Sequence, residues 1–415
     1  MMFVRDMGRG RGRAIFANRT ILRGEVVLDA KPYVSVPSST TSTCMECWQY
    51  VSDNNCTLKC KKCHQAVFCS DACAEKGSTR HALECAALKK LCCSSVVKDK
   101  GSRQMMHLAL RAMLGVTALK FSAVHIDSRR RLSDENMIAS TGPTPLMGPS
   151  TCSQIENNVM IDIGTAGAVN DRESVDRKNG KCLIEGIVSG QKGMESVEAL
   201  EDNRMAFSTQ QINQLTTAAK VLLKCAPSLS GEWSIRRVVS LLCKQECNVH
   251  GVWGGPDIGW RGVCTCIGMA LIPEASYFNH SCTPTLVAIR SAARMKMRSD
   301  SLHNPVEVSD IDFCKINCQG TSSSADLSYV ALHTIQAGEE LTISYVSCKQ
   351  TTEERQKALE SYMFKCTCAA CAGKARTHVM RNFLNRYACS KSTCPGLLVP
   401  FCGKDDSICA ICGLR

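Results

Sequence analysis

The stretch CMECWQYVSDNNCTLKCKKCHQAVFCSDACAEKGSTRHALEC, residues 44–85, decides how this part of the chain folds. It contains four closely spaced pairs of metal-binding side chains: Cys44-x2-Cys47, Cys60-x2-Cys63, Cys69-x3-Cys73 and His81-x3-Cys85. Two intervening residues let a tight turn point both sulfurs at one ion, and residues at i and i+4 share a helix face. These ligands suffice for two tetrahedral sites, so we predict that zinc replaces a hydrophobic core here.

The chain has 29 cysteines in 415 residues. Its N-terminus, residues 1–13, is basic and glycine-rich and lacks the apolar segment of a secretory signal. No run approaches the ~20 apolar residues of a membrane span. We therefore expect no membrane association, a location in the nucleus or the cytoplasm, and cysteines that bind metal rather than form disulfides. The isolated cysteines are expected to be buried free thiols: Cys152, Cys182, Cys225 and Cys243.

A second cysteine group is Cys366-x-Cys368-x2-Cys371. It supplies three ligands, so a tetrahedral zinc ion would need a fourth from elsewhere in the chain.

A third cysteine group closes the chain. Two pairs, Cys389-x4-Cys394 and Cys409-x2-Cys412, are typical of a small zinc ribbon. Cys402 lies between the pairs and could replace one ligand.

The formal net charge of the chain is +12. Zinc-bound cysteines are thiolates, so four occupied sites would lower this charge to about +5. The basic excess is therefore a weak argument for nucleic acid, and a basic substrate would require local acidic patches. The alternative is an RNA-contacting tail at Arg9, Arg11 and Arg13, which predicts a steep salt dependence of binding.

The rest of the chain alternates between strand, helix and irregular patterns. Residues 1–43 and 262–346 are predicted to form short strands, interrupted by a loop at about 291–326, because apolar runs follow turn residues. Residues 121–205 lack periodicity and are predicted to be mostly disordered. Helices are predicted over 104–120 and over 234–247. A third helix is predicted to begin at the Ser208–Gln211 capping box, which has a Phe207–Ile212 hydrophobic staple, and a fourth near the Thr351–Glu354 capping box.

Five motifs are weak singly and informative together: Gly10–Ala17, Gly24-Glu25, Asn279–Pro284, Gly338–Tyr345 and Cys366–Cys371. In order and spacing they resemble the SET methyltransferase fold. Residues 44–85 resemble the MYND zinc finger, inserted between the first SET strands and the remainder. This split arrangement resembles the SET-and-MYND (SMYD) protein-lysine methyltransferases.

The resemblance implies an α+β architecture that is mainly a β SET fold, with small sheets and a pseudoknot, a helical insertion, a MYND finger and a C-terminal zinc ribbon. The implied domains follow in chain order: N-terminal SET strands (1–43), MYND finger (44–85), helical insertion with its disordered segment (86–230), core SET domain (231–349), post-SET zinc segment (350–375) and ribbon (386–415).

The family also implies the zinc pairings, because MYND ligand pairs interleave. One ion would take Cys44, Cys47, Cys69 and Cys73, and the other Cys60, Cys63, His81 and Cys85. Cys282 would complete the post-SET site with Cys366, Cys368 and Cys371, giving about four zinc ions in all. MYND fingers commonly bind proline-rich peptides, but Ser78 stands where an aromatic residue is usual, so that platform is expected to be missing.

The implied activity is methyl transfer from S-adenosylmethionine to a lysine of a histone or non-histone protein substrate. The resemblance assigns cofactor binding to Gly10, Arg11, Gly12, Asn248, Asn279, His280, Tyr345 and Phe364. Catalysis would involve Tyr345 at the methyl-transfer site and Tyr362 in the lysine channel.

Three departures from the family pattern bear on this prediction. Thr285 replaces the usual Asn and is expected to weaken a local hydrogen-bond network. The residues after Asn248 diverge, and the sequence stops at Arg415 without a long helical C-terminal domain, so a short or truncated form with a more open substrate cleft is expected. The alternative function is a catalytically inactive scaffold or transcriptional co-regulator that recruits partners through its finger. A monomer is expected in either case.

Overall fold

The computed structural model describes residues 2–8, 12–38, 42–51, 58–97, 99–115, 193–254, 264–294, 325–401 and 407–413. All of these belong to one compact unit, and a second unit, residues 124–181, lies outside the described residues. Among the described residues, every helix is too short or too polar to traverse a lipid bilayer.

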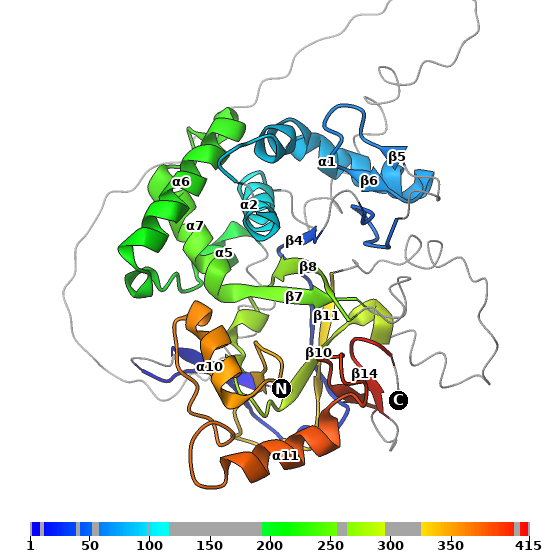
Figure 1. The fold of residues 1–415 in the computed structure, drawn as a ribbon, viewed down its shortest axis with the longest axis vertical. Coiled ribbons are helices and arrows are strands. Elements are labelled where there is room, and N and C mark those ends of the chain that lie inside the picture. The colour runs from blue at the N-terminus through cyan, green and yellow to red at the C-terminus, as the bar shows by residue number, and fades with distance from the viewer. Residues whose placement is uncertain are drawn as a thin grey trace, which may run out of the picture. The chain divides into compact units, whose positions relative to one another are not determined.

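The strands form small sheets, as the sequence predicts (Figure 1). Two sheets have three strands. The first sheet has the order β10 (Leu286–Arg290), β11 (Leu327–Ala331), β3 (Val26–Ala30), and the second has the order β4 (Val34–Pro37), β8 (Cys266–Leu271), β7 (Val249–Trp253). Three antiparallel pairs complete them: β1 (Met2–Asp6) with β2 (Arg13–Ala17), β5 (Leu58–Lys59) with β6 (Val67–Phe68), and β13 (Leu398–Pro400) with β14 (Ser407–Cys409).

One two-stranded ladder is parallel and joins distant motifs. β9 (Asn279–His280) pairs with β12 (Thr342–Ile343). The ladder continues beyond the strands, because the backbone N–H of Ser281 donates to the carbonyl of Ile343 at 2.9 Å. The Asn279–Pro284 and Gly338–Tyr345 motifs are thereby held together, as the predicted pseudoknot requires.

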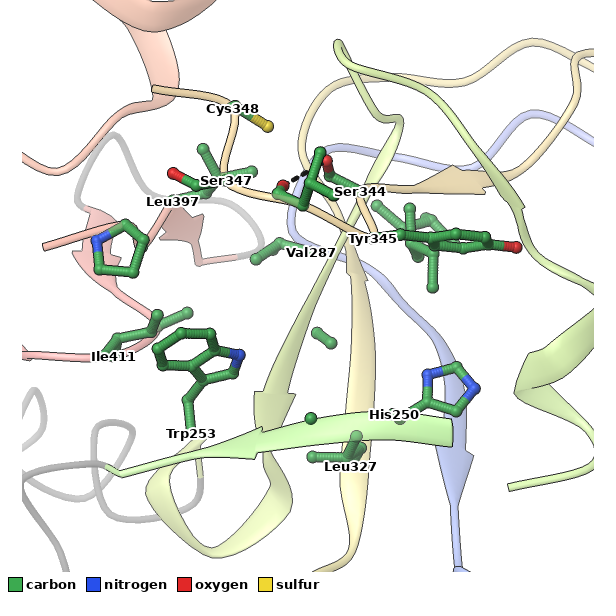
Figure 2. A pocket seen from close by; sticks show the side chains of 18 of the residues that line it. His250, Trp253, Val287, Leu327, Ser344, Tyr345, Ser347, Cys348, Leu397 and Ile411 are labelled. Atoms are coloured by element: carbon green, nitrogen blue, oxygen red, sulfur yellow. Dashed lines mark hydrogen bonds between the residues drawn. The ribbon is translucent and has the colours of Figure 1, made fainter. Parts of the chain in front are cut away.

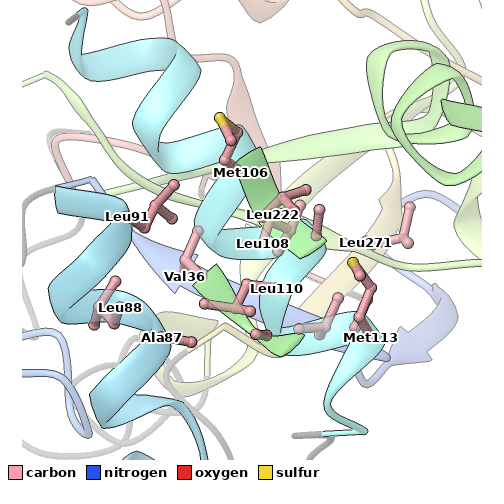
Figure 3. Close-up of a cluster of buried hydrophobic side chains, with 14 of the residues drawn as sticks. Val36, Ala87, Leu88, Leu91, Met106, Leu108, Leu110, Met113, Leu222 and Leu271 are labelled. Carbon is pink, nitrogen blue, oxygen red and sulfur yellow. The ribbon is translucent and has the colours of Figure 1, made fainter. Parts of the chain in front are cut away.

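Four helices form the larger helical layer: α1 (Asp71–Cys92), α2 (Lys100–Met113), α6 (Thr209–Cys225) and α7 (Ile235–Asn248). Leu88 and Leu91 of α1, Leu108 and Leu110 of α2, and Leu222 of α6 meet in one buried cluster (Figure 3). Shorter helices are α5 (Met194–Glu198), α10 (Thr352–Leu359) and α11 (Arg376–Tyr387), with single 3-10 turns at η2 (Arg204–Ala206), η3 (Pro227–Leu229), η5 (Ala275–Tyr277) and η6 (Glu360–Tyr362).

Three predicted helix starts, at Ser208, Ser234 and Thr351, are confirmed. Ser208 with Gln211, and Thr351 with Glu354, form complete capping boxes at α6 and α10. Ser234 caps α7, where its side chain accepts from the backbone N–H of Arg237.

Two helix-region predictions were wrong in part. The helix predicted over 104–120 runs from Lys100 to Met113, because Asp99 caps it through Ser102 and the chain turns at Leu114. The segment predicted as disordered to residue 205 contains α5 and the 3-10 turn η2 near its end, since Val197 and Leu200 are buried in the helical cluster. Residues 116–192 lie outside the described residues.

Trp48 connects the zinc finger to the SET core. It lies in the turn after Cys47, has a φ of 61° and is 3% exposed. Its ring packs on Gly268 of β8, where a Cβ atom on that residue would come within 2.3 Å of the indole. A side chain at this position would clash with the indole, so the segment around Trp48 lies directly against β8.

A buried ionic cluster also ties the finger to its neighbours. The Glu84 carboxylate of α1 accepts from Nε and Nη2 of Arg111 of α2, both at 2.7 Å, and its Oε2 lies 2.8 Å from Nε2 of His107. Arg111 also donates to the carbonyl of Ser35 in β4 at 2.6 Å. Burial alone would raise the pKa of Glu84, but Arg111 and His107 hold it well below its ordinary value.

We predict that Glu84→Ala destabilises the fold by about 3–5 kcal/mol, because Arg111 would be left as an uncompensated buried charge. Equilibrium denaturation monitored by circular dichroism measures this loss. Glu75→Ala, an exposed glutamate on the same helix, is the matched control and should change stability by less than about 0.5 kcal/mol. Equal effects of the two substitutions would contradict the role of the ionic cluster.

Candidate functional site

The structure gathers the sixteen predicted metal ligands into four sets. They are Cys44, Cys47, Cys69 and Cys73; Cys60, Cys63, His81 and Cys85; Cys282, Cys366, Cys368 and Cys371; and Cys389, Cys394, Cys409 and Cys412. Within each set the ligand atoms lie within 4.8 Å of one another. The interleaved finger pairs and the distant Cys282 therefore assemble as the family resemblance implied, and Cys402 lies outside the described residues.

The sulfur separations fit zinc. A tetrahedral ion with Zn–S bonds of about 2.3 Å needs ligand atoms about 3.8 Å apart. Observed separations are 3.4 Å for Cys47–Cys69, 3.7 Å for Cys60–Cys85, 3.4 Å for Cys282–Cys371 and 3.6 Å for Cys394–Cys409. All of these thiols are free, so the spacing is that of ligands around a shared centre and not of disulfides.

Arg355 is a residue of the post-SET site that the sequence reasoning missed. It projects from α10, is 1% exposed, and its Nε donates to Sγ of Cys282 at 3.1 Å. A guanidinium here offsets the negative charge that four thiolates leave on a zinc ion. The capping box at Thr351–Glu354 places Arg355 in the first turn of a helix. It does not predict that the Arg355 side chain points toward the cysteines.

His280 links the post-SET cysteines to the SET core. Its Nδ1 accepts from the backbone N–H of Tyr345 at 3.0 Å, and its Nε2 lies 3.3 Å from Sγ of Cys282. Because Nδ1 accepts, Nε2 carries the proton and donates to the sulfur. Burial lowers the pKa of His280 to about 4, so the ring is neutral at physiological pH.

A cavity of about 950 Å³ contains most of the residues predicted to bind the cofactor. Gly12, Asn248, Asn279, His280, Tyr345 and Phe364 all line it. Gly10 and Arg11 lie outside the described residues. Gly12 has a φ of +62°, a conformation that suits glycine and keeps the backbone close to the cavity.

Polar side chains around this cavity are held by internal hydrogen bonds. Asn279 donates to Glu340 at 3.0 Å, and Asn248 donates to the carbonyls of Lys244 and Glu201 at 2.8 and 3.2 Å. The amide of Asn279 is thus oriented across the pseudoknot, where Glu340 also lines the cavity.

Arg13 belongs to the same cavity. Its guanidinium lies 4.7 Å from the centre of the Tyr277 ring and donates to the Tyr277 hydroxyl at 3.0 Å and to the carbonyl of Ala199 at 2.7 Å. Both terminal nitrogens of Arg13 therefore donate hydrogen bonds within the protein, whereas an RNA-binding arginine would offer them to phosphate. Arg9 and Arg11 lie outside the described residues.

Aromatic rings close one end of the cavity. Ring centres are 5.0 Å apart for Tyr345 and Tyr362, and 6.2 Å apart for Tyr345 and Phe364. Met363, between Tyr362 and Phe364, has a φ of 63°. This left-handed turn lets both flanking aromatic residues face the cavity, so backbone strain is placed at the site itself.

A second cavity of about 520 Å³ adjoins the first, and Tyr345 and Tyr362 line both. Figure 2 shows Tyr345 at the wall of this second cavity. Its other walls are β7, the start of β10 and the C-terminal ribbon. The boundary between the two cavities, here called the aromatic partition, contains these two tyrosines together with Cys247, Asn248 and Ser276, which also line both cavities.

The Tyr345 hydroxyl donates to the carbonyl of Phe278 at 2.8 Å. Burial and then the neighbouring Tyr362 raise the pKa of Tyr345 above its ordinary value. The phenol therefore stays protonated at neutral pH and can orient and stabilise a reactant but not act as a base.

Thr285, the residue expected to weaken the local hydrogen-bond network, forms two hydrogen bonds within it. Its Oγ1 accepts from the backbone N–H of Thr342 at 2.8 Å, and its own N–H donates to Oγ1 of Thr342 at 3.1 Å. The two threonines bond reciprocally across the pseudoknot, so a shorter side chain makes the connection that an amide was expected to make.

The SET domain family model matches residues 12–346, which is most of the chain. The chain belongs to the SET domain family. The predicted fold and the predicted methyltransferase family are confirmed by this match and by the relatives described next.

Relatives of SET-and-MYND type extend over nearly the whole chain. A SET and MYND domain-containing protein of Dictyostelium discoideum is 24% identical over 399 residues, 93% of this chain and 86% of that protein. Histone-lysine N-methyltransferase ASHR1 of Arabidopsis thaliana is 24% identical over 407 residues, 97% of this chain and 62% of that enzyme. Histone-lysine N-methyltransferase SMYD1 of Homo sapiens is 20% identical over 370 residues, 88% of this chain and 55% of that enzyme. The chain spans less than two thirds of the length of these two enzymes.

The pH dependence of stability can be predicted from His250, which lines the second cavity. Its Nδ1 lies 3.2 Å from the hydroxyl of Tyr329, and burial lowers its pKa to about 4, from an ordinary value of about 6.5. The unfolded chain binds more protons between these values, so the stabilisation is present above about pH 6.5 and is lost as the pH falls toward 4.

The stability difference between the wild type and His250→Gln should therefore change when denaturation is repeated between about pH 7 and pH 5, with the wild type losing more on acidification. His378→Gln, at an exposed position of α11, is the control and should follow the wild type. Parallel pH curves for His250→Gln and the wild type would contradict the depressed pKa.

Proposed function

We propose that this chain is an S-adenosylmethionine-dependent protein-lysine N-methyltransferase acting on lysines of histone or non-histone proteins. The observation that carries the proposal is the meeting of two cavities at Tyr345 and Tyr362. The larger cavity, with Gly12, Asn279, His280 and Phe364, would hold the cofactor. The smaller cavity would admit the target lysine.

The residues of the partition suit the chemistry. Bound S-adenosylmethionine supplies a methyl group on a positively charged sulfur. The lysine amine must first lose a proton, although its ordinary pKa is about 10.4. Contact with the aromatic rings of Tyr345 and Tyr362 would remove water from the ammonium and favour its neutral form. Since Tyr345 keeps its own proton, the lysine proton must leave to solvent, and the aromatic walls supply alignment for in-line transfer.

We further propose that each of the four cysteine-rich sets holds one zinc ion. The post-SET ion would fix α10 and the following turn, which carry Tyr362 and Phe364, against the core through Cys282. The two finger ions would fix Trp48 and His81 where they contact the SET core and Glu84.

The rival function is a scaffold whose SET core does not bind the cofactor. Divergence after Asn248 motivates it, whereas the reciprocal Thr285–Thr342 bonds speak against a decayed core. A proline-rich partner at the finger has little support, because Ser78 is exposed and offers no aromatic surface. We also propose that the protein is a monomer and that it is located in the nucleus or the cytoplasm.

Methyl transfer tests the proposed activity. The protein is incubated with labelled S-adenosylmethionine and a cell lysate, and labelled lysines are mapped by mass spectrometry. Tyr345→Phe should lower transfer on the order of 100-fold, the effect of removing one oriented donor, and by more than any loss of affinity for S-adenosylhomocysteine that calorimetry detects. Tyr387→Phe on α11 is the matched control and should transfer normally.

Wild-type protein that binds no S-adenosylhomocysteine would favour the scaffold. Binding without transfer, or equal transfer by Tyr345→Phe, would remove the catalytic role of this tyrosine.

Metal analysis tests the zinc proposal. The protein as purified should contain four zinc ions, one for each set. Cys394→Ser should lower the content to about three, because a tetrahedral ribbon site loses one ligand, whereas Cys402→Ser should leave four. A loss of zinc in Cys402→Ser would instead make Cys402 the ribbon ligand.

A further inference from the structure

We propose that the C-terminal ribbon is part of the substrate-binding cleft, and that the ribbon and Trp253 together seat an apolar side chain of the substrate close to the target lysine. The proposal rests on the lysine methyltransferase function above. It adds a substrate class: polypeptides with an uncharged, apolar flank beside the lysine, in contrast to strongly basic tails.

The ribbon is a direct wall of the cleft. Pro395, Gly396, Leu397, Ala410 and Ile411 line the same cavity as Tyr345 and Tyr362. Figure 2 shows Trp253, Leu397 and Ile411 at one end of that cavity and Tyr345 and His250 at the other. A substrate whose lysine reaches the tyrosines through this cavity must therefore lie against the ribbon.

The ribbon is fixed to the SET core and so presents a preformed surface. The ammonium of Lys349, four residues after Tyr345, donates to the carbonyls of Cys389 and Lys391, both at 2.8 Å. Cys264, two residues before β8, packs against the buried cluster that contains the ribbon residues Cys394 and Leu397. The ribbon side of the cleft is thus fixed to the segment that carries Tyr345.

In the ribbon, the turn at Gly396 packs closely against Cys409 and Ile411. A side-chain Cβ at Gly396 would lie 2.5 Å from Sγ of Cys409 and 3.2 Å from Cβ of Ile411. Glycine at this position lets the backbone pass over the cysteine, and Ile411 is thereby held at the cavity wall.

The chemistry of the cleft selects the occupant. Among the described residues that line it there is no Asp, Glu, Lys or Arg. His250, the histidine of this lining, is neutral at physiological pH because burial lowers its pKa to about 4. An arginine or lysine beside the target would lose water here without meeting a carboxylate, which is unfavourable.

Trp253 offers the complementary apolar surface. It is a large hydrophobic residue that remains 37% exposed, at the end of β7 and next to the ribbon side of the cavity. Covering a partly exposed aromatic ring with an apolar side chain of the substrate removes its apolar surface from water, which contributes favourable binding free energy. The occupant is the substrate itself, because the surface is continuous with the site where its lysine must react.

An oriented peptide library tests this inference. Peptides with one central lysine and randomised flanks are methylated with labelled S-adenosylmethionine and sequenced in bulk. Wild-type protein should enrich Leu, Ile, Met or Phe at one flanking position at least about 5-fold over Arg, a range typical of apolar pocket discrimination. Trp253→Ala should reduce this enrichment to below about 2-fold, a ratio between flanking residues that can be read whatever the overall rate of the variant.

Trp253→Glu provides the sharper variant, because it places a carboxylate in the uncharged wall and should raise the relative use of Arg at the same position. Leu22→Ala, an exposed leucine outside the cleft lining, is the control and should keep the wild-type preference.

Wild-type preference for Arg or Lys flanks, no positional preference, or an unchanged preference in both Trp253 variants would overturn the inference. These outcomes differ from failure of the proposed function, in which the wild type methylates neither library peptides nor lysate proteins.

Discussion

The parallel ladder between Asn279–His280 and Thr342–Ile343 is the contact on which the rest of the site depends. It brings together two segments that are far apart in the chain, and Cys282 and Tyr345 each follow one of these strands by two residues. His280 extends the ladder in two directions, accepting from the Tyr345 backbone and donating to Cys282. Through these bonds the imidazole ring of His280 connects the cofactor cavity, the aromatic partition and the post-SET cysteines.

Four sets of candidate metal ligands supplement hydrophobic packing around this core. The finger docks through apolar side chains such as Val67 and Phe68 in the helical cluster, through Trp48, and through the Glu84–Arg111 ion pair. The post-SET cysteines and Arg355 fasten the segment that carries Tyr362 and Phe364. The ribbon, held by Lys349, takes a place beside the substrate cleft.

Much of the fold and site could be predicted from sequence because the informative residues are local or carry fixed spacing. Paired cysteines identify zinc sets, and capping boxes identify helix starts. The pairing of the finger ligands and the choice of Cys282 came from family resemblance, since spacing alone leaves them open. Arg355, Trp253 and the Thr285–Thr342 bonds were missed because their roles arise from tertiary packing. A single arginine or tryptophan in a sequence carries no sign of the direction in which its side chain will point.

The central claim is that two cavities meet at Tyr345 and Tyr362, one for the cofactor and one for the lysine. A crystal structure with bound S-adenosylhomocysteine tests this most directly. The account predicts the ligand in the cavity lined by Gly12, Asn279, His280 and Phe364, with its sulfur facing the two tyrosines and the Trp253 cleft left free. Ligand density in the Trp253 cleft, or a sulfur turned away from Tyr345, would contradict it.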